Sequence, residues 1–88
     1  MNIREKISKI VIEKVADIFA LDEKYVAEHR ELNFRKDLGA KSLQYFPLVT
    51  ALEAELDIEL EYHEFQIQAL TIELAIDFVI EAYNKSHK

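Results

Sequence analysis

Residues 36–49 read KDLGAKSLQYFPLV, and they hold the chain's only glycine, Gly39, its only proline, Pro47, and between them Ser42. Ser42 stands where a segment with helical spacing of apolar residues begins, and a serine at such a place most often caps the helix. Gly39 permits a tight turn just before it. That turn can raise Ser42 to the surface at a helix N-terminus, where backbone N–H groups and the helix dipole stabilise a phosphate. The stretch therefore predicts a site suited to a phosphoester.

The sequence pattern provides no catalytic base for Ser42. The three histidines, His29, His63 and His87, lie far apart along the chain, and none stands in a nucleophile elbow or beside an orienting acid. The loop pattern of an EF-hand is missing as well, so no metal site is predicted. We interpret Ser42 as a modified residue and expect that the protein is not an enzyme.

The residues after Ser42 predict a helix whose apolar stripe faces inward and whose Glu53 faces out. Members of this stripe recur every three or four positions, and they are Leu43, Phe46, Val49, Leu52 and Leu56. Phe46 is thereby assigned to the core, whereas Tyr45 lies off the stripe and is expected to be half exposed. Pro47 removes a helical hydrogen bond and crowds the preceding turn. We therefore predict that this helix begins late, near Pro47, or is distorted there.

The part of the chain before this helix predicts one helix and one long connection. The first twenty residues carry apolar residues at helical spacing, and Asn2 and Glu5 form a capping pair. From residue 21 to residue 40 the periodicity fades. We interpret residues 21–40 as an ordered loop that is anchored on the core by Leu32, Phe34 and Leu38.

The second half of the chain predicts two further helices. Residues 57–61, DIELE, alternate like a strand but have no strand to pair with, so we interpret them as an extended connector. Residues 62–68 predict a short third helix, and Thr71 is a good cap for a last helix. Residues 84–88 are expected to fray. The pattern predicts an all-α four-helix bundle with a long first loop and a short third helix.

The length and composition favour a single domain that spans residues 1–88. Half of the 88 residues are apolar, and a chain of this size buries roughly 60% of its unfolded surface. With no cysteine, disulfides and thiolate metal sites are excluded, and the cytoplasm is the expected location. The first ten residues hold no apolar run of the length that a signal peptide or a membrane span requires.

The charge is unevenly distributed around a net value of −6. Residues 1–36 carry eight basic and seven acidic side chains, whereas residues 37–83 carry one basic and ten acidic ones. An acidic field repels phosphate backbones and attracts basic protein surfaces. We therefore expect no nucleic-acid binding, and partner proteins with basic surfaces.

The stretch DLGAKSL, residues 37–43, resembles the prosthetic-group attachment motif of the acyl carrier protein family. The resemblance extends over nearly the whole chain, through Phe34 before the motif, LVTALEAELDIEL at residues 48–60 and ALTIELAIDFV at residues 69–79. It implies that Ser42 carries 4′-phosphopantetheine, whose thiol holds acyl intermediates of fatty acid, polyketide or related biosynthesis as thioesters. It also implies a monomer whose partners are a phosphopantetheinyl transferase and acyl-processing enzymes.

The chain departs from the family pattern beside the attachment serine. Lys41 replaces the family's aspartate, which basic groups of the transferase bind, and like charges across an interface cost several kcal/mol. Lys41 could instead stabilise the phosphodiester. Gln44 and Pro47 stand where the family has further acids. The residues assigned to partner recognition are Asp37, Lys41, Leu43, Gln44, Pro47 and Glu53.

The resemblance further implies that the bundle opens to shelter an acyl chain between its last three helices. The candidate residues for this acyl pocket are Val49, Leu52, Leu60, Ala75 and Phe78. Simple packing of these side chains against one another is the alternative interpretation. Two other functions stay open: an unmodified interaction protein with the carrier fold, which Lys41 and Pro47 favour, and an aminoacyl or peptidyl carrier.

Overall fold

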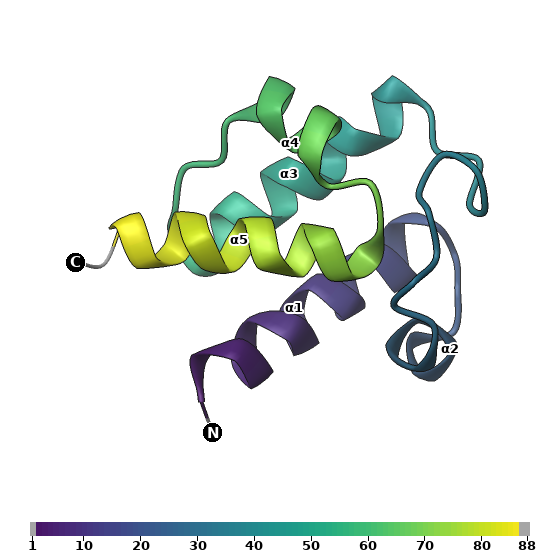
Figure 1. Ribbon diagram of the computed structural model, residues 1–88, viewed down its shortest axis with the longest axis horizontal. Coiled ribbons are helices and arrows are strands. Elements are labelled where there is room, and N and C mark those ends of the chain that lie inside the picture. The colour runs from purple at the N-terminus through teal and green to yellow at the C-terminus, as the bar shows by residue number, and fades with distance from the viewer. Residues whose placement is uncertain (1, 87–88) are drawn as a thin grey trace.

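The computed structural model describes residues 2–86 and folds them into helices, with no β-strand among those residues (Figure 1). The helices are α1 (Ile3–Ile18), α2 (Glu23–Glu28), α3 (Ser42–Leu56), α4 (Tyr62–Gln68) and α5 (Ile72–Ser86). The predicted all-α bundle is confirmed. Its expected short third helix is α4, with the bounds that the sequence pattern predicted.

Side chains that accept hydrogen bonds from free backbone N–H groups begin α1, α2, α4 and α5, and two of these caps were predicted. The Glu5 N–H donates to the Asn2 side chain at 2.7 Å, which confirms the predicted cap of α1. The Leu74 N–H donates to the Thr71 hydroxyl at 3.2 Å, which confirms the cap of α5. Both helix starts are therefore encoded locally, by a polar residue that precedes an apolar pattern.

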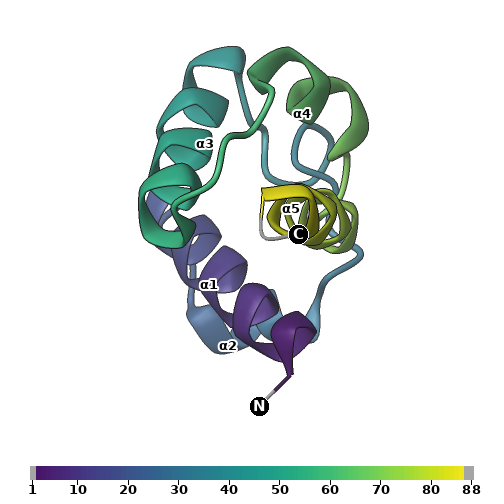
Figure 2. The ribbon, with the colours of Figure 1, turned by 90° about the vertical axis from the view of Figure 1, so that its left-hand side faces the viewer.

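The helices enclose one core. The helix α1 lies against both α3 and α5, and α4 contacts α3 and α5 on the side away from α1 (Figure 2). Each fully buried large apolar side chain stabilises such a core by about 1.5–3 kcal/mol. The largest of these side chains are Tyr45, Phe34, Phe65, Ile7, Leu48, Leu52, Ile72, Ile76, Val11, Val15, Val26 and Val79.

The long connection between α1 and α3 contains a helix that the sequence pattern did not predict. The Asp22 carboxylate accepts hydrogen bonds from the backbone N–H groups of Lys24, at 2.8 Å, and Tyr25, at 3.3 Å, and so begins α2. This helix has six residues and buries only Val26, so its apolar periodicity is too short to be recognised. The interpretation of residues 21–40 as one loop is corrected accordingly.

The remainder of this connection is ordered, as predicted. Phe34 is fully buried, and Leu32 and Leu38 pack against the core while partly exposed. The segment also pairs with the start of α5 through its backbone: the Phe34 N–H donates to the Leu70 carbonyl at 3.0 Å, and the Ile72 N–H donates to the Leu32 carbonyl at 3.2 Å. These bonds fix the path of the chain toward Ser42.

The segment between α3 and α4 is extended, as predicted for DIELE. Asp57 ends α3 in the left-handed region, with φ of 53°, and the next apolar side chains, Ile58 and Leu60, are buried. At the other end of the chain, α5 continues to Ser86. Residues 84–86 are therefore helical where fraying was expected, and residues 87 and 88 lie outside the described residues.

Ion pairs join α1 and the α2 region to the start of α5. Arg4 pairs with Glu73, and with Asp77 at 3.0 Å, while Arg30 reaches Glu73 at 3.5 Å. Hydrogen bonds to Asp77 and Glu73 raise the pKa of the Arg4 guanidinium above its ordinary value. These side chains are substantially exposed, so each pair contributes little to stability. Within residues 2–86, no helix is long and apolar enough to cross a membrane.

Candidate functional site

A tight turn delivers the chain to the candidate serine. Gly39 has a φ of +64°, a left-handed conformation that glycine adopts readily and that lets the chain turn tightly here. The turn is closed by a hydrogen bond of 2.8 Å from the Ala40 N–H to the Phe34 carbonyl. Because Phe34 is fully buried, the turn is anchored to the core, and the chain leaves it toward the surface at Ser42.

Ser42 is the first residue of α3 and is exposed. The N-cap position is held by Lys41, which is extended, with φ of −107° and ψ of 162°. The Gln44 side chain accepts a hydrogen bond from the Lys41 N–H at 2.9 Å and completes the helix start. The common interpretation of such a serine as the cap is therefore wrong here. Among the described residues, the Ser42 hydroxyl has no hydrogen-bond partner, so it is free for chemistry.

Two aromatic side chains brace this first turn. The Tyr62 hydroxyl, at the start of α4, donates a hydrogen bond to the Ser42 carbonyl at 2.9 Å. The Tyr62 ring also meets the Phe46 ring edge-on, with centroids 5.8 Å apart. The sequence analysis missed Tyr62, because no local pattern relates a residue of the short helix to one twenty positions earlier. Its two contacts hold Ser42 and Phe46 in fixed relation to α4.

The structure reverses the predicted environments of Tyr45 and Phe46. Tyr45 is 1% exposed, and its ring lies edge-on to Phe34 and Phe65, with centroids 5.9 and 6.3 Å away. Phe46 is 63% exposed. The buried stripe of α3 consists of Tyr45, Leu48, Val49, Leu52 and Leu56. Tyr45 and Leu48 take the places that were predicted for Leu43 and Phe46, while Val49, Leu52 and Leu56 are buried as predicted. Both sets have helical spacing, so periodicity alone did not distinguish them.

The predicted late start of this helix is also wrong. The helix α3 runs from Ser42 to Leu56 with Pro47 inside it. Pro47 cannot donate to the Leu43 carbonyl, but both residues lie at the surface, where water can hydrate that carbonyl. The Gln44 cap and the Tyr62 hydrogen bond support the first turn from the other side. The cost of Pro47 is thus partly offset by tertiary and capping contacts.

The six residues assigned to partner recognition fall into two groups. Lys41, Leu43 and Pro47 are exposed around Ser42. The other three act within the fold: the Asp37 carboxylate accepts from the Asn33 N–H at 2.7 Å, the Glu53 carboxylate accepts from the Leu60 N–H at 3.0 Å, and Gln44 completes the helix start.

The residues assigned to an acyl pocket belong to one core. Val49, Leu52, Leu60 and Ala75 are buried members of the core cluster, and Phe78 packs against it while partly exposed. Phe78 also lies edge-on to Phe65, with centroids 5.5 Å apart. A surface depression beside Phe78 is lined in addition by Glu59, Glu61, Glu64, Gln68, Glu81, Ala82, Lys85 and Ser86.

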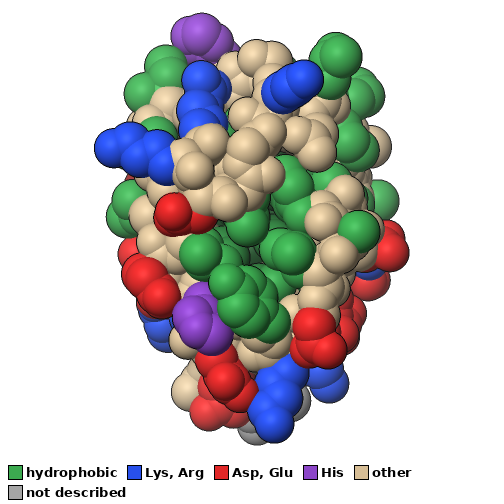
Figure 3. Space-filling view, turned by 90° about the vertical axis from the view of Figure 1, so that its right-hand side faces the viewer, with side chains coloured by type: hydrophobic (Ala, Val, Ile, Leu, Met, Phe, Trp, Pro, Cys, Tyr) green, Lys and Arg blue, Asp and Glu red, His purple; other side chains and the backbone are tan. Residues whose placement is uncertain are grey.

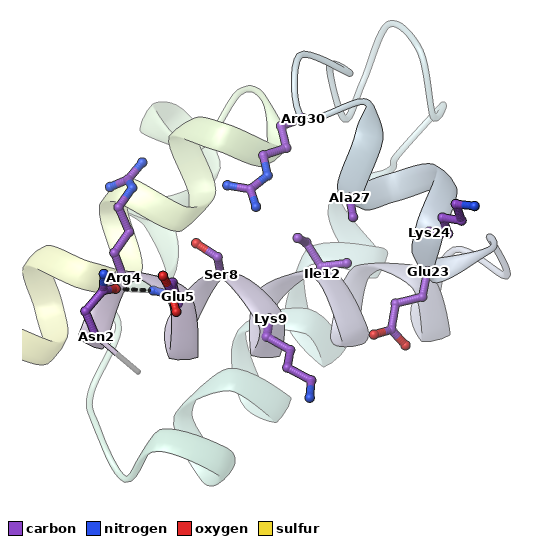
Figure 4. Close-up of a pocket in the computed structure, with 10 residues that line it drawn as sticks. All are labelled: Asn2, Arg4, Glu5, Ser8, Lys9, Ile12, Glu23, Lys24, Ala27 and Arg30. Atoms are coloured by element: carbon purple, nitrogen blue, oxygen red, sulfur yellow. Dashed lines mark hydrogen bonds between the residues drawn. The ribbon is translucent and has the colours of Figure 1, made fainter.

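A larger open cavity lies elsewhere, between α1 and α2 (Figure 4). It is lined by Asn2, Arg4, Glu5, Ser8, Lys9, Ile12, Glu23, Lys24, Ala27 and Arg30. The Ser8 hydroxyl is directed from α1 into this space and has no hydrogen-bond partner among the described residues. None of these side chains belongs to the Ser42 region. Within residues 2–86, no group of histidine and carboxylate side chains is arranged to hold a metal ion.

Comparison with known proteins identifies the family. No protein-family model matches the chain. The chain is 40% identical over 78 residues to the acyl carrier proteins of three strains of Buchnera aphidicola subsp. Acyrthosiphon pisum, Tuc7, 5A and APS. Each alignment covers 89% of this chain and 89% of the relative. This chain therefore belongs to the acyl carrier protein family, as the resemblance of residues 37–43 indicated.

Proposed function

We propose that the protein carries acyl intermediates as thioesters on a 4′-phosphopantetheine group attached to Ser42. The observation that carries this proposal is the exposed, unpartnered hydroxyl at the first residue of α3. The free N–H groups of a helix start and the adjacent Lys41 ammonium both favour a phosphodiester at this position. The residues present therefore fit the group.

Attachment requires that the Ser42 oxygen displaces a phosphate leaving group. The Ser42 Oγ–P bond forms as the phosphoanhydride of coenzyme A breaks, and adenosine 3′,5′-bisphosphate leaves. None of the described side chains is hydrogen-bonded to the Ser42 hydroxyl, so we assign the base that accepts its proton to the transferase. His29, a possible base, is instead hydrogen-bonded to the Tyr25 carbonyl at 2.8 Å. The chain thus acts as the substrate of this step.

When bound, the group supplies a terminal thiol on a flexible arm, which holds the acyl chain. The chain's own residues would present the arm to a phosphopantetheinyl transferase and to acyl-processing enzymes of fatty acid, polyketide or related biosynthesis. A tethered thioester reaches each enzyme at high effective concentration without free diffusion of the intermediate. We propose that the carrier works as a monomer in the cytoplasm, a reducing compartment that fits its lack of cysteine.

Intact mass after incubation with coenzyme A and a phosphopantetheinyl transferase tests the attachment. We expect the mass to rise by one phosphopantetheine group, and the increase to vanish in Ser42→Ala. Ser8→Ala is the matched control, because Ser8 is 4% exposed and should leave loading unchanged. No mass increase with any of a panel of transferases would favour an unmodified interaction protein instead.

We further propose that an acyl chain enters the core among Val49, Leu52, Leu60, Ala75 and Phe78. Support comes from their membership of one apolar cluster that adjoins α4, the short helix. Each methylene buried contributes about 0.8 kcal/mol. The hexanoyl form should therefore be more stable to urea than the acetyl form, by up to about 3 kcal/mol. Equal stability of the two forms would place the acyl chain outside the protein.

A further inference from the structure

Apolar side chains are exposed on one face of α3 beside Ser42. Leu43 is 86% exposed, Phe46 is 63% exposed, and Pro47 is also at the surface. Their positions, three and four residues apart, place them next to one another on the helix. Contiguous exposed apolar side chains of this kind mark interaction sites, whereas isolated ones do not.

The exposed face of α3 is also without charge over most of its length. From Ser42 to Leu52 the helix contains no charged residue. The first acids, Glu53 and Glu55, are engaged within the fold: Glu53 accepts from the Leu60 N–H, and Glu55 pairs with Lys14 at 3.4 Å. A basic partner surface therefore finds no free carboxylate on the first three turns of α3.

Basic side chains border the apolar face at its Ser42 end. Arg35, Lys36 and Lys41 are all exposed. Arg35 and Lys36 belong to the turn that the bond between Ala40 and Phe34 closes, and Lys41 follows it as the N-cap of α3. Figure 3 shows Lys and Arg side chains over the upper part of the side on which this turn lies. The nearby acid of the turn, Asp37, already accepts a hydrogen bond from the backbone.

Two exposed acids, Asp57 and Glu59, lie at the opposite end of α3, in the connector. Glu61 and Glu64 are exposed at the start of α4, near Tyr62 and the Ser42 end, and both carboxylates already accept hydrogen bonds within α4. A helix of 15 residues is about 22 Å long. This length exceeds twice the screening length of about 8 Å at physiological salt. Asp57 and Glu59 are therefore too far away to neutralise the basic side chains beside Ser42.

The Phe46 side chain is ordered by contacts within the fold before any partner binds. Its ring rests against Tyr62, and the Tyr62 hydroxyl is bonded to the Ser42 carbonyl. A side chain that is already ordered loses less conformational entropy when a partner binds. Exposed aromatic anchors of this kind commonly supply much of the binding energy of an interface.

We propose that the Ser42 end of α3 docks an enzyme through an apolar recess bordered by carboxylates. On the enzyme, the recess would receive Leu43, Phe46 and Pro47, and its carboxylates would face Lys41 and Arg35. Basic partner surfaces, which the net charge led us to expect, would meet the acidic connector instead. This inference rests on the proposed function, because it concerns the enzymes that act on Ser42.

Loading kinetics with two forms of one transferase test the charge of the partner surface. The first form is a broad-specificity phosphopantetheinyl transferase with a basic carrier-binding surface, and the second has those basic residues changed to glutamate. We expect the second form to load this chain with a kcat/KM about tenfold higher, and Lys41→Asp to reverse the preference. Lys24→Asp, an equal charge change on α2, should leave it unaltered. Added salt should reduce the difference.

The apolar contact is tested in the same assay. Phe46→Ala should raise KM severalfold with both transferases and leave kcat nearly unchanged. The lost contact contributes to binding of the transferase and takes no part in the chemical step. Ile67→Ala is the matched control, since Ile67 is 55% exposed on α4. Equal effects of the two substitutions would overturn the apolar docking site. Thermal unfolding of each variant confirms that the fold is intact.

The outcomes separate this inference from the function on which it rests. If neither transferase loads Ser42, both the carrier function and the inference fail. If both load it and the basic form is faster, only the inference is overturned. A dimer in sedimentation experiments that Phe46→Ala disrupts and Ile67→Ala does not would also overturn it, since the face would then bind a second copy of this chain.

Discussion

Replacing a tyrosine by phenylalanine should have opposite effects at two positions of this fold. Tyr45 is 1% exposed, and its hydroxyl has no hydrogen-bond partner among the described residues. The Tyr62 hydroxyl donates a bond of 2.9 Å to the Ser42 carbonyl. Each substitution therefore removes one hydroxyl group. At Tyr45 the hydroxyl lowers the stability of the fold, and at Tyr62 it makes a hydrogen bond that stabilises it.

The magnitudes follow from these environments. A buried hydroxyl without a partner lowers stability by about 1–3 kcal/mol. Its removal leaves a small void, which reduces the gain in stability. Tyr45→Phe should therefore raise the free energy of unfolding by about 1 kcal/mol. The phenylalanine ring still offers a face to the Arg35 guanidinium, which lies 5.4 Å from the Tyr45 ring centroid. Tyr62→Phe should lower the free energy by about 0.5–1.5 kcal/mol.

Urea denaturation followed by circular dichroism measures both changes. The denaturation slope should be unchanged, so that the shift in midpoint reports stability alone. For a domain of this size, about 1 kcal/mol corresponds to a change of roughly 4–8 °C in Tm, which differential scanning calorimetry checks independently. The two variants should differ by about 2 kcal/mol, although the chemical change is the same.

A loss of stability in Tyr45→Phe, at an unchanged slope, would refute this reasoning. It would mean that the Tyr45 hydroxyl is satisfied in the native state. An unchanged stability in Tyr62→Phe would likewise show that the bond to the Ser42 carbonyl contributes nothing, and the bracing of the first turn of α3 would have to rest on the ring contact with Phe46.

Five further substitutions test the turn, the first helix and the core by urea denaturation. Gly39→Ala should cost about 1–2 kcal/mol because φ is +64°, and Gly39→Asn should cost less; equal costs would point to a steric cause. Ser8→Ala should gain about 1 kcal/mol, because alanine favours a helix interior and the buried hydroxyl has no described partner; a loss would show that this hydroxyl is engaged. Phe34→Ala should cost about 3–5 kcal/mol, and the exposed Phe46→Ala about 1 or less, and similar costs would contradict the assigned burial.

Local signals in the sequence located the candidate site. A lone glycine before a serine and a helical pattern placed Ser42 at a turn before a helix, and Gly39 does adopt a left-handed φ. The same local logic identified the caps at Asn2 and Thr71, because capping depends on residues only a few positions apart. Exposure of the Ser42 hydroxyl was not determined by these signals, since Lys41 and Gln44, and not Ser42, complete the helix start.

Contacts between distant segments decided the rest. Two overlapping apolar stripes were available in the first half of α3, and the one that contains Tyr45 is buried because Phe34 and Phe65 lie against its ring. The helix α3 forms with Pro47 inside it because its exposed first turn can be hydrated and because Tyr62 supports its start. Helical periodicity states that one side of a segment is buried, and only the neighbouring elements determine which side it is.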